Sequence, residues 1–293
     1  MPNIRDIKKK TVGVKNTQQI TRAMKMVSTA KLRQATVRLS ATRLYLQKLE
    51  EIVSDVREVL SEDAPVKTVY DGRPVKSSGV IIIAGERGLC GSFNSDIFKS
   101  SLTFLESLGD KKRCIFPVGN KTRDFFKRLP CYPIAGFDFP VNSISSVDVV
   151  RQAAKIAMDK YISQEIDELY IIYSAYISAL ERKIIRKKLL PLDSVKKAVR
   201  SDKRPVAREM FFDPSPEALL SSLIPRYIEG LFMRALLESA ASEQSARMIA
   251  MGAATDRAED IISQLTLTYN RTRQAVITKE LSEVIAGADS LSN

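Results

Sequence analysis

Both ends of the chain lack the residues that interrupt a helix. Between Asn3 and Ala64 there is no proline and only one glycine, Gly13, and no proline follows Pro225 in this 293-residue sequence. Because proline removes a helix hydrogen bond and clashes with the preceding turn, its absence allows one continuous helix at each end. Helices of that length in water need a partner along one narrow face. These two end segments therefore constrain the fold more than any other feature.

The first end segment has the spacing of a coiled coil. In its second half, seam positions alternate in steps of three and four residues, which is the a/d pattern of paired helices. Upstream, the apolar pattern runs through Ile20, Met24 and Val27, which predicts a phase shift of the seam within residues 30–35. The seam positions of the second half are Leu39, Thr42, Leu46, Leu49, Val53, Val56 and Leu60.

The second end segment predicts another long helix. It begins with Asp213-Pro-Ser-Pro-Glu217, in which Asp213 or Ser215 can cap the helix and the prolines occupy its first turn. Gly230 and Gly252 cost about 1 kcal/mol each in a helix interior, which a helix of this length tolerates. Near its end the predicted seam comprises Ile262, Leu265, Tyr269, Thr272 and Val276, and apolar positions continue at Ile277, Leu281 and Val284.

Length and charge indicate that the two end helices pair. A helix of about 60 residues spans roughly 90 Å, whereas a compact domain of about 140 residues has a radius of gyration of only ~14 Å. Residues 1–50 hold twelve basic side chains against two acidic ones, while the last segment holds seven against twelve. We therefore predict an antiparallel coiled coil of an N-terminal helix (residues 1–64) and a C-terminal helix (residues 209–293).

The middle segment, residues 66–208, alternates short branched runs with helical patterns. This alternation predicts a small, Rossmann-like, mostly parallel α/β domain. Its helices are expected at Asp96–Leu108, Lys121–Leu129 and Val147–Ile166, and Ser178–Leu190 can add an edge strand. The expected strands are Val80–Ala84, Cys114–Val118, Cys131–Gly136 and Leu169–Ser174.

A glycine-rich turn follows the first expected strand and raises the question of nucleotide binding. Gly85, Gly88 and Gly91 are spaced G-x-x-G-x-x-G, which matches neither the Walker loop nor the dinucleotide pattern, and Ser92 follows without a lysine. The interpretation we favour is a structural turn that lets a helix pack closely on the sheet. The other interpretation is that Arg87 binds an anion or a carboxylate of a partner.

Composition limits the chemistry that the chain can perform. The sequence has no histidine, which excludes the usual triads, most zinc sites and the commonest general base. Cys90, Cys114 and Cys131 lack metal-ligand spacing and are expected to be reduced thiols. No apolar run is long enough to span a membrane, and the polar start is unlike a signal peptide.

The basic N-terminal helix admits a nucleic-acid interpretation as well. Such binding favours basic side chains on one face, interleaved with aromatic ones. Here the basic residues are spread around the helix, and Tyr45 is the one aromatic residue among the first 50. A helix that is basic all round suits an acidic sleeve of partner subunits better, so we expect no nucleic-acid partner.

Four stretches resemble one protein family, and together with the order of the parts the likeness extends over almost the whole chain. Residues 20–33 (ITRAMKMVSTAKLR) resemble the first-helix signature of the gamma subunit of the rotary F-type ATP synthase, in its bacterial form. Residues 87–94 (RGLCGSFN) resemble its middle-domain motif. Residues 236–251 (LLESAASEQSARMIAM) and 265–280 (LTLTYNRTRQAVITKE) resemble its last helix. In this family the glycine turn is structural.

The resemblance implies a rotor shaft. The paired helices would lie inside a ring of alternating alpha and beta subunits, and the α/β domain would sit on the membrane ring of c subunits with the epsilon subunit. Proton flow would turn the shaft, which would couple it to ATP synthesis or hydrolysis in the ring. The chain itself would hold no catalytic residue, cofactor, metal or small-molecule substrate. It would be a peripheral protein at the cytoplasmic face of the cell inner membrane.

The same resemblance assigns contacts with a beta subunit to four residues, Met24, Lys25, Arg273 and Gln274. Some positions depart from the family pattern, among them Ser92 and Gly252, and no partner contact is assigned to Gly252. Leu190–Arg208 carries no cysteine, so the thiol regulation of photosynthetic relatives is not expected. The alternative function is a nucleotide-binding α/β enzyme with a coiled-coil dimerisation arm.

Overall fold

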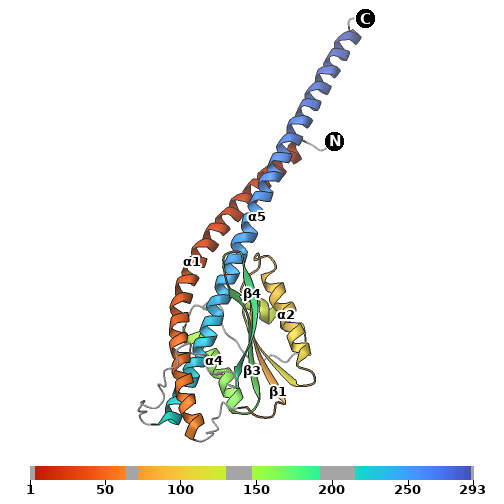
Figure 1. Cartoon of the computed structure of the whole chain (residues 1–293). Helices are drawn as coiled ribbons and strands as arrows, with labels where there is room; N and C mark the ends of the chain where they lie inside the picture. The colour runs from red at the N-terminus through yellow and green to blue at the C-terminus, as the bar shows by residue number, and fades with distance from the viewer. Residues whose placement is uncertain (1–3, 64–71, 130–146, 192–214, 292–293) are drawn as a thin grey trace. The chain divides into compact units, whose positions relative to one another are not determined.

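The computed structural model describes residues 4–63, 72–129, 147–191 and 215–291 (Figure 1). Two long helices begin and end the described chain, and four strands with three shorter helices lie between them in the sequence. In chain order the elements are α1 (Ile4–Asp63), β1 (Ser77–Ile83), α2 (Phe93–Ser107), β2 (Lys112–Val118), α3 (Asn120–Phe126), α4 (Val147–Ile162), β3 (Glu168–Tyr176), β4 (Arg182–Leu190) and α5 (Pro216–Leu291).

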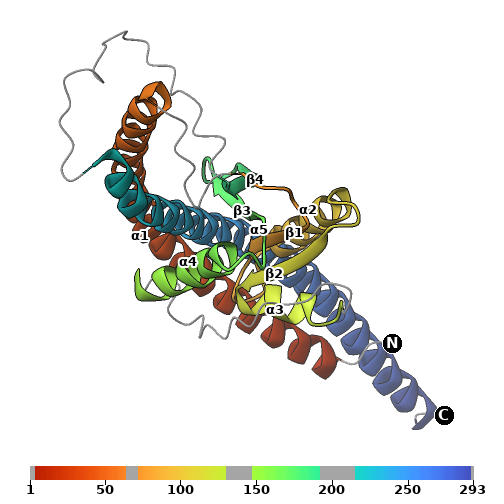
Figure 2. The same ribbon diagram turned by 90° about the horizontal axis from the view of Figure 1, so that it is seen from below.

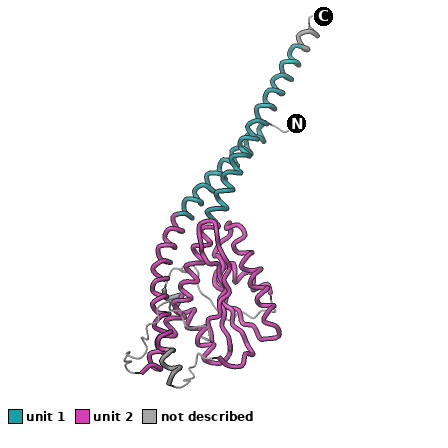
Figure 3. Tube along the Cα trace, in the orientation of Figure 1, with its two compact units in different colours: residues 1–29, 247–293 teal, residues 30–246 magenta. Residues whose placement is uncertain are grey.

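Close packing divides the chain into two compact units (Figure 3). Unit 1 comprises residues 1–29 and 247–293, and unit 2 comprises residues 30–246. Each long helix therefore contributes one part to each unit. The three-part division of the sequence at 1–64, 66–208 and 209–293 follows chain order instead, and it stays a prediction.

A four-stranded sheet forms the centre of unit 2, in the order β2-β1-β3-β4. Strand β1 pairs in parallel with β2 and β3, and β4 pairs antiparallel with β3. The expected mostly parallel sheet is thus confirmed, and so is the edge strand expected within Ser178–Leu190. The strand expected at Cys131–Gly136 lies outside the described residues.

Each face of the sheet packs against its own helices. Because successive side chains of a strand point to opposite faces, Ile81 and Ile83 join one core while Val80 and Ile82 join the other. The first core also contains α4 and parts of α1 and α5, and the second contains α2, α3 and Ala246 of α5. Figures 1 and 2 show α2 and α4 on opposite faces of the sheet. Helices on both faces explain why β1 is fully apolar after its first three residues.

The predicted seam of α1 is confirmed where it lies in unit 2. Its apolar positions from Leu39 to Val56 are buried, with Val53 fully inaccessible and Leu46 only 2% exposed, and the side chain of Leu60 lies outside the described part of the structure. A Cβ on Gly230 of α5 would lie 2.5 Å from Leu46 Cδ2, and the hydroxyl of Tyr227 donates to Glu50 at 3.3 Å. Residue numbers on α5 fall as those on α1 rise, so the helices run antiparallel.

The predicted phase shift of the α1 seam is wrong. Ile20 and Val27 are 60% and 55% exposed, whereas Thr21 and Ser28 are 8% and 2% exposed. The buried and half-buried positions keep one spacing along the helix because small polar side chains occupy the seam in unit 1. Thr21 and Thr255 share a hydrogen bond between their hydroxyls at 2.8 Å, which satisfies both groups where the helices meet.

Helix α5 begins as its sequence predicts. The Ser215 hydroxyl accepts a hydrogen bond from the Ala218 backbone N–H at 3.3 Å, and Pro216 is the first helical residue. The other cap candidate, Asp213, lies outside the described residues.

The last part of α5 extends past the start of α1 within unit 1 (Figures 1 and 3). The predicted seam from Ile262 to Val276 is confirmed, since its members are half-buried and the residues between them are exposed. Beyond Val276 the apolar side chains of Ile277, Leu281 and Val284 are exposed, because no part of α1 lies opposite them.

Candidate functional site

Met24 and Lys25 lie on α1 beside its contact with α5 in unit 1. Met24 is half-buried and Lys25 is exposed. The stem of Lys25 passes over Gly252, where an added Cβ would lie 3.6 Å from both Cε and Nζ of the lysine. Because 3.6 Å is an ordinary van der Waals distance, a small side chain would fit at this position, and the packing of Lys25 does not require a glycine.

Arg273 and Gln274 lie farther along α5, and both side chains are exposed. They follow Thr272 of the seam directly, so they flank the helix contact and point away from it. The Arg273 guanidinium makes no hydrogen bond or ion pair with a described residue, which leaves its planar fork of donors for another molecule.

The structure does not bring these four residues into one site. Gly252, beside Lys25, and Arg273 are separated by a stretch of α5 that rises about 30 Å at 1.5 Å per residue. Met24 and Lys25 thus form one candidate contact and Arg273 with Gln274 form a second, at two levels of unit 1.

The glycine turn of unit 2 is closed by its own hydrogen bonds. The side-chain oxygen of Asn94 accepts from the Gly85 N–H at 2.8 Å, and the Gly85 carbonyl accepts from the Lys121 N–H at 3.2 Å. Gly119 adopts a φ of 103°, and a Cβ there would lie 2.5 Å from the Ala84 carbonyl oxygen. The Gly85 N–H, which a phosphate cradle would need, is therefore engaged. This geometry favours the structural interpretation of the turn.

A carboxylate in this turn was not singled out by the sequence. The pKa of Glu86 is raised to about 7, first by burial and then by the nearby charge of Glu243, against the opposing effects of Arg123 and Arg87. The Asn120 amide donates to one Glu86 oxygen at 2.9 Å, while the other oxygen is buried and has no hydrogen-bond partner among the described residues. A carboxylate beside the loop disfavours a phosphate there, which again supports a structural role.

A second group missed by sequence reasoning surrounds Glu238 on α5. Its carboxylate is almost fully buried and accepts from Arg43 of α1 at 2.9 Å and from Arg234 at 3.1 Å. Arg43 also donates to the backbone oxygen of Tyr176. Glu238 lies within residues 236–251, which resemble the last helix of the family, but the sequence around it does not indicate a contact with an arginine almost two hundred residues earlier.

Comparison with known proteins tests the resemblance over the whole chain. A family model described as ATP synthase matches residues 3–291. The ATP synthase gamma chain of Heliobacterium modesticaldum is 40% identical over 297 aligned residues, which cover 99% of this chain and 100% of that protein. That of Desulfitobacterium hafniense is 39% identical, with coverage of 99% and 100%.

The chain belongs to the ATP synthase gamma chain family. Solved structures agree with this placement. A chain from the central stalk and c-ring of the Tetrahymena thermophila mitochondrial ATP synthase has a TM-score of 0.57 and 25% identity, covering 80% of this chain and 99% of that one. A chain from the Euglena gracilis mitochondrial ATP synthase has a TM-score of 0.63 at 21% identity, covering 98% and 94%. The gamma chain fold therefore accounts for both the helix pair and the α/β sheet.

Proposed function

We propose that this gamma chain is the central rotor shaft of a bacterial F-type ATP synthase. It couples proton flow through the membrane ring to ATP synthesis or hydrolysis at the alpha–beta catalytic sites. One observation carries the proposal: a relative named ATP synthase gamma chain matches this chain from end to end at 40% identity. The antiparallel pair of long helices supplies the shaft that such a role requires.

The surface of unit 1 suits a shaft that turns inside a sleeve. Val12, Ile20 and Val27 of α1 are each more than half exposed. The same helix also carries many basic side chains. Exposed apolar side chains give a rotating surface that forms no fixed ion pair. Basic side chains around them attract an acidic sleeve without specifying one angle.

Coupling follows from the asymmetry of the helix pair. A shaft with no rotational symmetry presents a different face to each surrounding catalytic site. Each orientation therefore stabilises a different conformation at each site, and a site that binds ATP more tightly favours one orientation in return. This reciprocal coupling between shaft orientation and site conformation produces the torque on the shaft. The chain therefore needs no catalytic residue of its own.

We assign the contacts with beta subunits to the two levels of unit 1. Arg273 and Gln274 offer an exposed donor fork and a neutral amide to a carboxylate on one beta subunit at a time. Met24 and Lys25 move past the acidic loop of a beta subunit as the shaft rotates. The Met24 thioether forms no fixed ion pair with this loop, and the Lys25 ammonium stays hydrated. These assignments rest on family resemblance and on the exposure of the side chains.

The remaining partners belong to the membrane end of the rotor. We infer that the α/β sheet of unit 2 contacts the epsilon subunit and the ring of c subunits, so that the chain is peripheral at the cytoplasmic face of the inner membrane. In the described part of the chain, no helix combines the length and apolarity needed to cross a bilayer.

Co-purification with tagged beta subunit tests the proposed function. We expect one copy of the chain per three alpha–beta pairs in the purified complex, measured by native mass spectrometry. A nucleotide-binding α/β enzyme with a dimerisation arm would instead form a dimer and bind ATP by itself. Saturable binding of ATP to the isolated chain in calorimetry, with no assembly into the ring, would favour that enzyme.

A further inference from the structure

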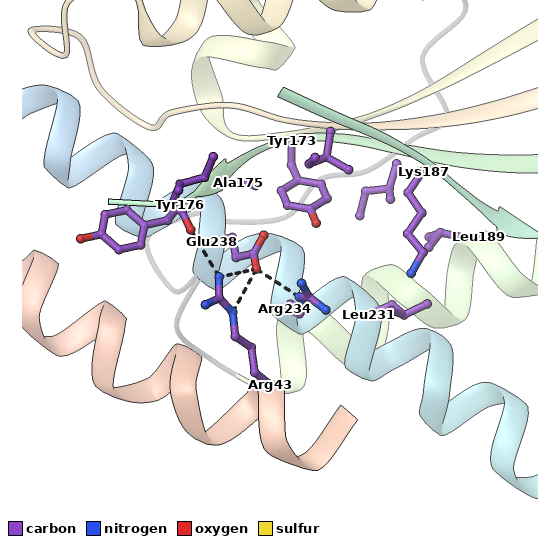
Figure 4. A pocket seen from close by; sticks show the side chains of 12 residues that line it. Arg43, Tyr173, Ala175, Tyr176, Lys187, Leu189, Leu231, Arg234 and Glu238 are labelled. Atoms are coloured by element: carbon purple, nitrogen blue, oxygen red, sulfur yellow. Dashed lines mark hydrogen bonds and ion pairs between the residues drawn. The ribbon is translucent and has the colours of Figure 1, made fainter. Parts of the chain in front are cut away.

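A cavity of about 340 Å³ lies within unit 2, between the strand pair β3–β4 and the helices α1 and α5 (Figure 4). This volume falls in the range of small-molecule sites. Most of the cavity wall is apolar. Strands β3 and β4 form one side of it, and helices α1 and α5 form the other. The apolar part of the wall includes Ile171, Ala175, Ile177, Ile185, Leu189 and Leu231, and the Tyr173 ring adds to it, while the Tyr173 hydroxyl hydrogen-bonds to Glu238.

Three cations and one carboxylate also line the cavity. The heads of Arg43 and Arg234 converge on the same oxygen of Glu238, Oε1, at 2.9 and 3.1 Å. Figure 4 shows the two guanidiniums on either side of this carboxylate, with Lys187 on the strand opposite. One carboxylate thus serves two arginines, which leaves further donors of both guanidiniums unsatisfied by Glu238.

Lys187 adds a third positive charge without a matched partner. Burial lowers the pKa of its ammonium, the charge of Arg234 lowers it further, and Glu50 and Glu238 oppose these effects. The ammonium makes no hydrogen bond or ion pair within the described part of the chain. When Glu50 and Glu238 are both counted against the three cations, the cavity keeps an excess of one positive charge.

We propose that this cavity binds a single-chain amphipathic monoanion, a medium-chain carboxylate. The carboxylate head lies among Arg43, Arg234 and Lys187, and the hydrocarbon chain lies against the apolar wall. A bidentate guanidinium–carboxylate contact suits the two arginine heads. The volume equals about eleven water volumes, which matches a chain of roughly eight to ten carbon atoms.

Binding of such an anion has a mechanical consequence for unit 2. The ligand would contact strands β3 and β4, helix α5 and Arg43 of α1 together, so occupancy ties the sheet to both helices. A ligand that binds the folded state alone raises its stability with concentration. Octanoate should therefore raise the unfolding temperature of the chain in a saturable manner.

Calorimetry on the full chain tests the proposal with three probes. Octanoate carries head and tail, octan-1-ol carries the tail alone, and acetate carries the head alone. We expect one octanoate to bind per chain, with both other probes at least about tenfold weaker, because each lacks one of the two interactions. Octan-1-ol or acetate binding as tightly as octanoate would overturn the assignment, as would octanoate failing to bind.

Two neighbouring lysines provide a matched pair of variants. Lys187→Met keeps the stem and removes the charge, so octanoate affinity should fall at least about tenfold. Lys188→Met makes the same change on the other face of β4, where Lys188 pairs with Glu168 at 3.2 Å, and should leave the affinity within about twofold. Equal losses in both variants would indicate nonspecific attraction and refute the site.

A cavity-filling variant keeps the test independent of charge. Ala175→Met retains every cation and carboxylate but occupies space in the cavity, so octanoate binding should be lost while circular dichroism shows a folded chain. Unchanged octanoate affinity in a folded Ala175→Met chain would place the binding elsewhere and contradict the proposal.

Discussion

Gly230 provides a sharp test of how closely the two long helices pack in unit 2. An alanine Cβ at this position would lie 2.5 Å from Leu46 Cδ2 and 3.4 Å from its Cγ. Carbon atoms in contact prefer about 3.5–4.0 Å, so the leucine must move. Leu46 is 2% exposed and has no route to solvent. Overpacking of this kind costs about 1–3 kcal/mol, against a gain of about 1 kcal/mol from replacing a helical glycine.

The net effect expected for Gly230→Ala is a loss of about 1 kcal/mol in the free energy of unfolding. Gly13→Ala is the matched control, because α1 is helical there and nothing lies within 4 Å of the added Cβ. That variant should gain up to about 1 kcal/mol from helix propensity alone.

Urea unfolding followed by circular dichroism measures both variants under the same conditions. The difference between the two free energies of unfolding should be about 1–3 kcal/mol, with Gly230→Ala the less stable. If Gly230→Ala is stabilised as much as Gly13→Ala, the helices are not in the close contact that the structure shows, and the reasoning fails.

Three further predictions concern unit 1 and the glycine turn. Replacing both Arg273 and Gln274 with alanine should change the free energy of unfolding by no more than about 0.5 kcal/mol, since both side chains are exposed, yet lower turnover or coupling of the reconstituted complex several-fold. Unchanged turnover and coupling would show that the two side chains contact only solvent. Met24→Lys should lower protons pumped per ATP, because a fixed ionic hydrogen bond worth about 1.5–3 kcal/mol traps one rotary position; pumping equal to that of the parent would contradict the placement. Because the pKa of Glu86 is raised from 4.5 to about 7, the free energy of unfolding should fall as the pH rises between these values. Glu86→Gln should remove about 1 kcal/mol of this fall, after a discount for solvent screening, and urea unfolding at pH 5 and pH 8 measures it. A slope that survives in Glu86→Gln would assign the titration to another group.

The fold was predictable where hydrophobic pattern and local structure agree. Leu46, Leu49 and Val53 repeat at seam spacing and are buried, and the branched run of β1 is the central parallel strand. The cap at Ser215 follows from local hydrogen bonding, which neighbouring residues alone determine. These features need no knowledge of distant segments.

The seam of unit 1 was misassigned because apolarity is an incomplete guide to burial. Thr21 and Ser28 are buried where the helices meet, while Ile20 and Val27 point away from that contact. A helix that also meets a surrounding sleeve exposes apolar side chains for a second partner. A pattern of apolar residues then reports both contacts at once and cannot separate them.

The polar groups of unit 2 could not be predicted, since each depends on several distant segments. The arrangement of Arg43, Glu238 and Lys187 needs α1, α5 and β4 to meet. The close approach at Gly230 likewise depends on Leu46 of the other helix, although the glycine had suggested only a tolerable cost. For Arg273 and Gln274, exposure followed from the seam, while their contact with a beta subunit stays a prediction.

Rotation of the chain inside the ring is the most direct test of the shaft. Alpha and beta subunits fixed to a surface would be assembled with a chain carrying Thr103→Cys, an exposed position on α2, to which a visible probe is attached. The account predicts that ATP drives the probe round in one direction, in steps that stop when ATP is withdrawn. Sustained ATP hydrolysis by the same assembled complexes with a stationary probe would contradict it.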